Sequence, residues 1–229
     1  VTNLTAIAAG TSHVLGLREN GTVAGWGGNL NGQTNVPAGL SNVVAVAAGG
    51  NHSMALRADG TVACWGDNSR SVNIPPSVSN IVAISAGLNF NLAIQADRTP
   101  VVYGSPSGGS ISTLPLGAKA RALAAGSDFV VMLTEAGTAL NSGGTNVPAG
   151  LSNLVAISAG NFFTLALRGD GTVVGWGQNT SGQTTIPASA TNVVAIAAGE
   201  NSGFAVRADG SLVNWGNGAA TTLAIPNGL

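Results

Sequence analysis

The sequence predicts an all-β fold, a β-propeller of six blades of about 38–39 residues each, and three observations carry this prediction. First, segments ending in Ala-Gly recur along the 229 residues, and their glycines stand at positions 10, 49, 87, 126, 160 and 199. Second, every unit holds three or four short strand signals and no helix signal. Third, the interval from Gly199 through the last residue and on to Gly10 matches the others in size, as a ring requires. An open solenoid, the structural rival, would need capping ends and does not predict ends that match in phase.

The strands of one unit follow in a fixed order. In unit two an apolar strand ends at the recurrent glycine (residues 43–49, VVAVAAG), a second strand follows (residues 52–58, HSMALRA), and a third ends in Trp-Gly (residues 61–66, TVACWG). The tripeptide at residues 35–37, NVP, gives a fourth strand signal. Small antiparallel sheets arranged radially leave only short strand edges, which favours a propeller over a sandwich.

Asp-Gly or Asn-Gly dipeptides join the second strand to the third in four units. These dipeptides tolerate the positive φ angles of a two-residue type I′ turn, so they predict tight β-hairpins. They are Asn20-Gly21, Asp59-Gly60, Asp170-Gly171 and Asp209-Gly210.

Residue sizes also fit a radial plan. The Ala-Ala-Gly segments suit the crowded axis where blades converge, and large aromatic residues near the end of the third strand supply surfaces that pack neighbouring blades. These aromatic residues are Trp26, Trp65, Trp176 and Trp215, with Tyr103 at the equivalent place in unit three. We expect the N- and C-terminal strands to close the ring, which makes residues 1–229 a single domain.

Composition excludes several functional classes. A net charge of −1 gives no electrostatic footprint for nucleic acid, and apolar runs such as residues 43–48 are far too short to insert into a membrane. A single cysteine, Cys64, forms no intramolecular disulfide. His13 and His52 lack the cysteine cluster or acidic loop of a metal site, so we expect no metal and no cofactor.

The repeat reads AAG-x-x-H-[SV]-x-x-L-R-[AE]-[DN]-G-T-V-x-x-W-G and then N-x-x-G-Q-T-x-[VI]-P. It resembles the regulator of chromosome condensation repeats in their short bacterial form, most strongly in units one, two, five and six. The resemblance implies a propeller fold but neither nucleotide exchange nor nucleosome binding, which need charged loops. This family usually has seven blades, so the chain is either a six-bladed ring or a segment that lacks one unit.

Units three and four depart from the repeat. Unit three has Asp97-Arg98-Thr99-Pro100 in place of the hairpin Asp-Gly, followed by a looser connection, GSPSGGSIST. Unit four has Asn141 where a tryptophan is expected and a short loop from Ser142 to Val147, which explains its interval of 34 residues. Functional divergence and structural drift both account for these departures.

Most reactive side chains are explained by their place in the repeat. His13 and His52 share one position with Phe90, Phe129, Phe163 and Ser202, which indicates packing at a strand start. Six acids lie in or beside hairpin turns, where their side chains bond nearby amides. The acids left over are Asp67, Asp128 and Glu200. No residue is therefore assigned a catalytic role, and we expect the chain not to be an enzyme.

The loops after the recurrent glycines emerge on one face, which is the expected binding face. Phe162 stands where other units have Ser, Asn or Asp, and an exposed aromatic side chain is a common interface anchor. The alternative is that Phe162 folds back over its own blade. The residues expected at this face are Ser12, Asn51, Asn89, Phe90, Asp128, Phe129, Phe162, Glu200 and Asn201.

The expected function is a non-catalytic module that binds a protein partner through this face. We place it outside the cell or at the cell surface, within a longer bacterial protein, with the cytoplasm as the other possible location. The alternative function is recognition of a glycan, either lectin-like or by a polysaccharide hydrolase or lyase that uses Asp128 and Glu200 as its acid and base.

Overall fold

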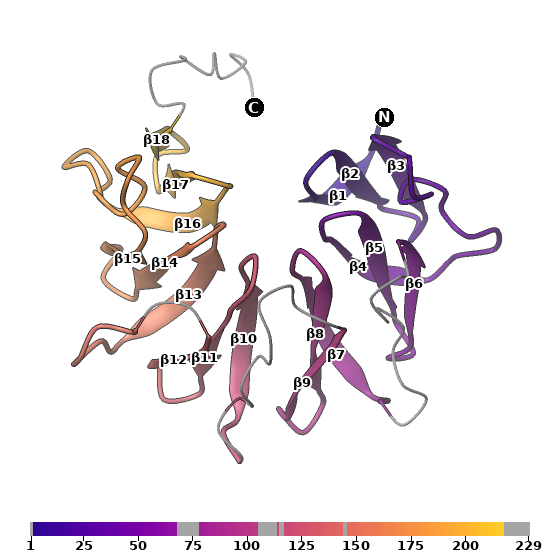
Figure 1. Cartoon of the computed structure of the whole chain (residues 1–229), viewed down its shortest axis with the longest axis horizontal. Coiled ribbons are helices and arrows are strands. Elements are labelled where there is room, and N and C mark those ends of the chain that lie inside the picture. Colours follow the sequence, from indigo (N-terminus) through magenta and orange to yellow (C-terminus); the bar gives the residue numbers. More distant parts are fainter. Residues whose placement is uncertain (1, 68–77, 105–113, 115–116, 144–145, 218–229) are drawn as a thin grey trace.

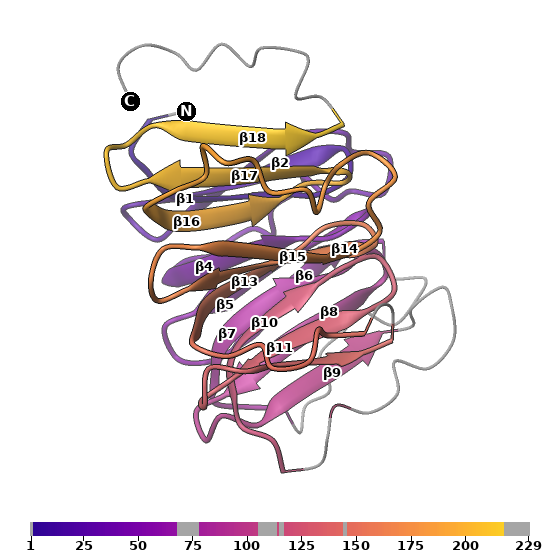
Figure 2. The same ribbon diagram turned by 90° about the vertical axis from the view of Figure 1, so that its left-hand side faces the viewer.

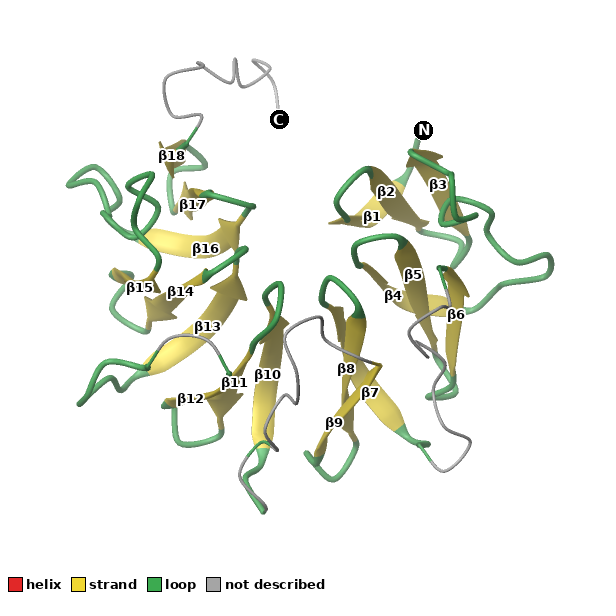
Figure 3. Cartoon of the chain, viewed as in Figure 1, coloured by secondary structure: helices red, strands yellow, loops and turns green. Residues whose placement is uncertain are grey.

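The computed structural model describes residues 2–67, 78–104, 114, 117–143 and 146–217. This part of the chain contains eighteen strands in six antiparallel sheets of three, and no helix (Figure 3). The sheets follow one another around an arc, each with its first strand toward the centre (Figure 1). The predicted all-β propeller of six blades is therefore confirmed.

Each blade takes its three strands in chain order, so that the middle strand pairs with both others. The strands are β1 (Leu4–Ala9), β2 (His13–Arg18) and β3 (Val23–Gly27) in blade one; β4 (Val43–Ala48), β5 (His52–Arg57) and β6 (Val62–Gly66) in blade two; β7 (Ile81–Ala86), β8 (Phe90–Gln95) and β9 (Pro100–Gly104) in blade three; β10 (Ala120–Ala125), β11 (Val130–Thr134) and β12 (Ala139–Ser142) in blade four; β13 (Leu154–Ala159), β14 (Phe163–Arg168) and β15 (Val173–Gly177) in blade five; and β16 (Val193–Ala198), β17 (Ser202–Arg207) and β18 (Leu212–Gly216) in blade six. Residues 35–37 form no strand, so the fourth strand predicted there is wrong.

The hydrophobic core is divided among the blade interfaces. Each of five buried clusters joins one blade to the next, from blades one and two through blades five and six. In the interface of blades five and six, for example, Leu165 and Leu167 of β14 pack with Ala205 and Trp215 of blade six. Both faces of an interior blade are thus covered, and the middle strands are the most buried elements.

Blades one and six lie on either side of the opening in the arc (Figure 1). The N-terminal strand β1 pairs with β2 inside its own sheet, and β18 pairs with β17. Apolar side chains on these end blades are more exposed than their counterparts inside the arc: Ile7 is 69% exposed and Leu212 41%. Ring closure by the terminal strands stays a prediction, because residues 218–229 lie outside the described part.

The predicted aromatic packing is confirmed for Trp65, Tyr103, Trp176 and Trp215, each of which joins a cluster with the preceding blade. Trp26 of blade one is 38% exposed instead. The Gly-Gln-Thr loops explain the indole positions, since the Gln33 carbonyl accepts a 2.9 Å hydrogen bond from Trp65 Nε1 in the next blade. Unit four lacks such a loop, and Trp176 Nε1 has no partner among the described residues.

The β-hairpins between middle and outer strands differ from the predicted turn type. In blade one the Gly21 amide bonds the Arg18 carbonyl at 2.9 Å, and only Gly21 of the turn has positive φ, at 72°. This is a three-residue loop, a type I turn followed by a left-handed residue, so the predicted type I′ turn is wrong. A positive φ of 80–82° recurs at Gly60, Gly171 and Gly210, and Arg98 adopts the same left-handed conformation in unit three with φ of 71°.

Replacing Arg98 by glycine is expected to raise the free energy of unfolding by about 1 kcal/mol, because a left-handed conformation strains any residue with a Cβ. Arg98 approaches Glu135 only at 3.9 Å with both side chains about half exposed, so little attraction is lost. Urea unfolding of Arg98→Gly and of the parent chain measures the change. Equal or lower stability would contradict the strain assigned to Arg98.

Candidate functional site

The two ends of the propeller differ in their connections. Each inner strand is joined to its middle strand by the loop at the recurrent glycine. The chain leaves the outer strand at the same end, because Gly28 N and Asp67 N, which follow outer strands, donate hydrogen bonds to the Ser12 and Asn51 carbonyls in these loops. We call this the glycine-loop end. The turns between middle and outer strands lie at the opposite end, which we call the hairpin end. Figure 2 shows both ends from the side, with the arrowheads of β16 and β18 pointing one way and that of β17 the other.

Five of the six recurrent glycines, all but Gly199, are required by a close approach. A Cβ added to Gly49 would lie 2.2 Å from His52 Cε1, and one added to Gly87 would lie 2.3 Å from Phe90 Cε1. The ring three residues after each of these glycines therefore occupies the space where a side chain would stand. The loops are tight for this reason, and they bring the next residue of each blade to the axis.

A pocket of about 410 Å³ lies among the six glycine loops. Its wall consists mainly of the alanine and glycine residues that end the inner strands, as the crowded axis predicted. The residue directly after each recurrent glycine also lines it: Thr11, Gly50, Leu88, Ser127, Asn161 and Glu200. The second residue after each recurrent glycine is not part of the lining; these residues are Ser12, Asn51, Asn89, Asp128, Phe162 and Asn201.

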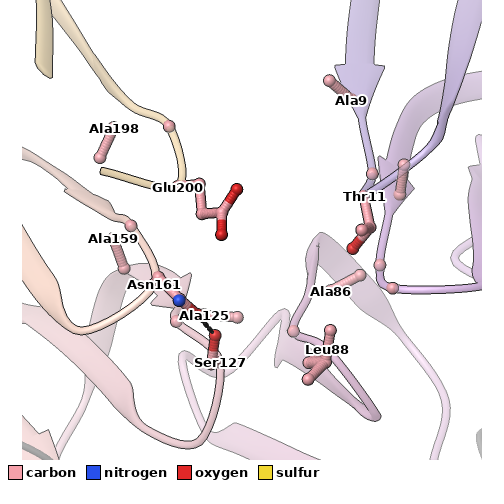
Figure 4. A pocket seen from close by; sticks show the side chains of 18 residues that line it. Ala9, Thr11, Ala86, Leu88, Ala125, Ser127, Ala159, Asn161, Ala198 and Glu200 are labelled. Atoms are coloured by element: carbon pink, nitrogen blue, oxygen red, sulfur yellow. Dashed lines mark hydrogen bonds between the residues drawn. The ribbon is translucent and has the colours of Figure 1, made fainter. Parts of the chain in front are cut away.

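Glu200 is the charged residue of this lining, and its carboxylate points into the space between the blades (Figure 4). Thr11 lies on the opposite side, and the Ser127 hydroxyl donates a hydrogen bond to Asn161 Oδ1 (Figure 4). Backbone bonds fix these loops to their neighbours: Asn161 N bonds the Glu200 carbonyl at 3.1 Å, and Ser127 N bonds the Asn161 carbonyl at 3.1 Å. The lining is therefore a fixed frame with one anionic group.

Two of the residues predicted for the binding face do not lie at the surface. The prediction that Phe90 and Phe129 lie on this face is wrong, because their side chains are 0% and 3% exposed and pack in the core between blades. Phe162 is 45% exposed, so it does not fold back over its blade. The remaining members lie in the glycine loops as expected; Ser12, Asn51 and Glu200 are exposed, and Asn89, Asp128 and Asn201 are half-buried.

The histidines occupy packing positions, as predicted from the repeat. His13 and His52 are nearly inaccessible; His13 Nε2 lies 3.0 Å from Ser53 Oγ and His52 Nε2 lies 2.7 Å from Asn91 Oδ1, in each case across a blade interface. Burial lowers the pKa of both imidazoles. Burial also raises the pKa of the Cys64 thiol to about 12, so this thiol is not a nucleophile at neutral pH.

The structure gives no support to an acid and base pair at the axis. Glu200 lines the pocket, whereas Asp128 does not. Within the described ranges, no three His, Cys, Asp or Glu side chains gather in a way that suits a metal ion. The same part of the chain has no helix with the length and apolarity of a membrane span.

A family model described as the Regulator of chromosome condensation (RCC1) repeat matches residues 4–33, 43–71 and 154–183. These segments lie in units one, two and five, three of the four units in which the resemblance is strongest. Three units of the chain thus match the model of this repeat, which confirms the resemblance seen in the sequence. No curated protein sequence matches it.

Solved structures confirm the fold. The chain is similar to the ectodomain of the Arabidopsis thaliana receptor kinase ACR4, with 26% identity and a TM-score of 0.79 over 94% of this chain and 80% of that one. It is also similar to the ectodomain of the Physcomitrella patens receptor kinase CR4, with 26% identity and a TM-score of 0.78 over 93% of this chain and 61% of that one. It is also similar to yeast RCC1 (Prp20), solved with Kap60 bound, with 18% identity and a TM-score of 0.75 over 94% of this chain and 70% of that one. The chain thus spans 61% of the length of the Physcomitrella patens structure.

Proposed function

We propose that this repeat-containing propeller is a non-catalytic module that binds a protein partner through its glycine-loop end. The observation that carries the proposal is the exposure of Phe162. The phenylalanines one position further along, such as Phe163, are buried in blade interfaces, whereas Phe162 presents its ring to solvent beside the axial pocket. An exposed aromatic ring on a fixed loop is a typical anchor of a protein interface.

Three further points support this proposal. Backbone hydrogen bonds hold neighbouring loops together, so little conformational entropy is lost on binding. The buried histidines and thiol have structural roles, which leaves no nucleophile among them for catalysis. Proteins of similar fold include yeast RCC1 with Kap60 bound and two receptor ectodomains, which favours protein binding and, as part of the proposal, a position outside the cell.

The test is quantitative capture of partners from native lysate by the immobilised chain. Phe162→Ala is expected to reduce capture of a specific partner at least tenfold, and Phe162→Ala with Asn89→Ala further still, because interface anchors contribute about 2 kcal/mol or more. Val44→Ala is the matched control, since Val44 is a 54% exposed apolar residue near the hairpin end.

Unchanged capture by both Phe162 variants, with unaltered melting curves, would contradict the proposal. A polysaccharide panel is run beside the lysate. Glycan binding that depends on Phe162, without any protein capture, would favour the glycan alternative instead. Product release that is lost in both Asp128→Asn and Glu200→Gln would show catalysis and would also overturn the proposal.

A further inference from the structure

Charge is distributed unequally between the two ends of the propeller. Among the described residues every lysine and arginine lies at the hairpin end: four arginines end middle strands, Arg98 lies in a turn, Lys119 is 3.4 Å from Asp97, and Arg121 is the second residue of β10. Six acids share that end with them. The charged residues described at the glycine-loop end are Asp67, Asp128 and Glu200, and all three are acidic.

Among the described residues, charge is therefore unevenly distributed although the chain as a whole is close to neutral; Arg70 lies outside the described residues. Charges of one sign at one end raise the local concentration of ligands of opposite charge and repel ligands of the same sign. The glycine-loop end is thus suited to a basic partner and unsuited to a phosphate backbone or an acidic peptide.

Glu200 concentrates this charge in the axial pocket. Its side chain is exposed, and no described residue forms a hydrogen bond or ion pair with its carboxylate. Its backbone is fixed all the same, because the Glu200 carbonyl accepts the Asn161 amide at 3.1 Å. The Glu200 carboxylate can therefore accept hydrogen bonds from a ligand without first breaking an ion pair with a described residue.

The rest of the pocket wall defines the shape of a suitable ligand. The alanine side chains at the strand ends and Leu88 provide apolar contact, while Asn161, in the loop bonded to that of Glu200, offers a further oxygen acceptor on the same side of the pocket. A ligand with an alkyl stem and a cationic head satisfies both parts of the wall, because the stem packs on the alanines while the head bonds the oxygens. Lysine and arginine side chains have this form.

We propose that the axial pocket receives a lysine or arginine side chain of the protein partner, with Glu200 as its counter-ion. This inference rests on the proposed function and names the chemistry of the partner: a basic segment that crosses the glycine-loop end, inserts one cationic side chain at the axis and contacts Phe162 at its flank.

The test uses small probes and the whole chain, so it does not depend on a partner being found. N-acetyl-Gly-Lys-Gly-amide and its arginine analogue are titrated against the isotope-labelled chain by NMR. Both peptides are expected to change the chemical shifts of the backbone amide resonances of the glycine loops. The norleucine analogue, with the same stem but no charge, is expected to bind at least tenfold more weakly. Raising the salt concentration is expected to weaken binding of the two charged peptides alone.

Glu200→Gln is expected to weaken the binding of both charged peptides at least tenfold. Glu19 is an exposed glutamate at the hairpin end, and Glu19→Gln is expected to leave their binding unchanged. The fold is not at risk in either variant, because both side chains are exposed. Equal binding of the norleucine peptide, or unchanged binding by Glu200→Gln, would overturn the inference. Binding of spermidine at the pocket without binding of either peptide would overturn it as well, since the cation would then come from a free polyamine.

These outcomes are distinguishable from failure of the proposed function. Capture that depends on Phe162 together with a negative peptide titration would retain the protein-binding proposal and reject the cation pocket.

Discussion

Replacing Gly160 by alanine is expected to lower the free energy of unfolding by about 3 kcal/mol, whereas the same change at Gly199 is expected to alter it by less than about 1 kcal/mol. Both glycines end an inner strand of a nearly identical repeat unit. A Cβ at position 160 would lie 2.0 Å from Phe163 Cε1 and 2.5 Å from the Gly199 carbonyl oxygen. A Cβ at position 199 would meet nothing nearer than Phe204 Cε2 at 3.6 Å, because unit six has Ser202 in place of the phenylalanine.

The two glycine variants are compared by urea denaturation followed by fluorescence. A lower transition midpoint with unchanged slope in Gly160→Ala is the expected result. If Gly160→Ala does not fold, Gly199→Ala still tests the explanation, because a comparable loss there would show that the glycine is needed for its backbone and not for the adjacent ring. Equal stability of both variants would contradict the close approach.

Leu165→Ala is expected to cost about 3 kcal/mol; in the arrangement of the described residues, where blade one does not cover blade six, Phe204→Ala costs less than about 1.5 kcal/mol, although the two residues hold the same position in their blades. Leu165 is fully buried by blade six. Phe204 lies on the face of blade six that is turned away from blade five, and it is only partly buried. Truncating a side chain that water already reaches removes less apolar surface and leaves no cavity.

This pair of variants also tests ring closure. Calorimetry is expected to show a large fall in melting temperature for Leu165→Ala alone. If the terminal strands close the ring in solution, blade one covers Phe204, and its truncation then costs as much as a core phenylalanine, about 3–5 kcal/mol. Measurement at two protein concentrations separates closure within one chain from cover by a second copy, because only the latter depends on concentration.

The sequence was sufficient to predict the blades because each unit repeats its strand pattern with little change. The fourth strand predicted at residues 35–37 was wrong, because the local bonds of Asn35 N to the Gly32 carbonyl and of Val36 N to the Thr34 carbonyl keep this segment in a loop. The turn type was wrong because Asp-Gly serves two hairpin geometries, and only the φ of the first residue distinguishes them. Arg98 shows that the geometry belongs to the position, since it adopts the glycine conformation without being glycine.

The site was harder to predict than the fold. Loop membership indicated which residues lie at one end, and Phe162 and Glu200 were found by comparing units. Phe90 and Phe129 were misplaced because a loop-adjacent phenylalanine and a core phenylalanine look alike without the depth of the loop. The alignment of the units already indicated their burial, because Phe90 and Phe129 share the packing position of His13 and His52, and this evidence outweighs their closeness to the loops.

The hydrogen bonds of the buried histidines have a consequence for how near-identical units find their correct neighbours. His13 requires the polar Ser53 across its interface and His52 requires Asn91, whereas Phe90 of blade three packs with Val130 of blade four. A blade paired out of order would set an imidazole against valine or a phenyl ring against asparagine, and would leave a buried polar group unsatisfied at about 1–3 kcal/mol. Chains built of similar repeats are prone to misassembly and domain swapping, and these mismatches disfavour both. The two histidine contacts thus favour the observed order of blades one, two and three.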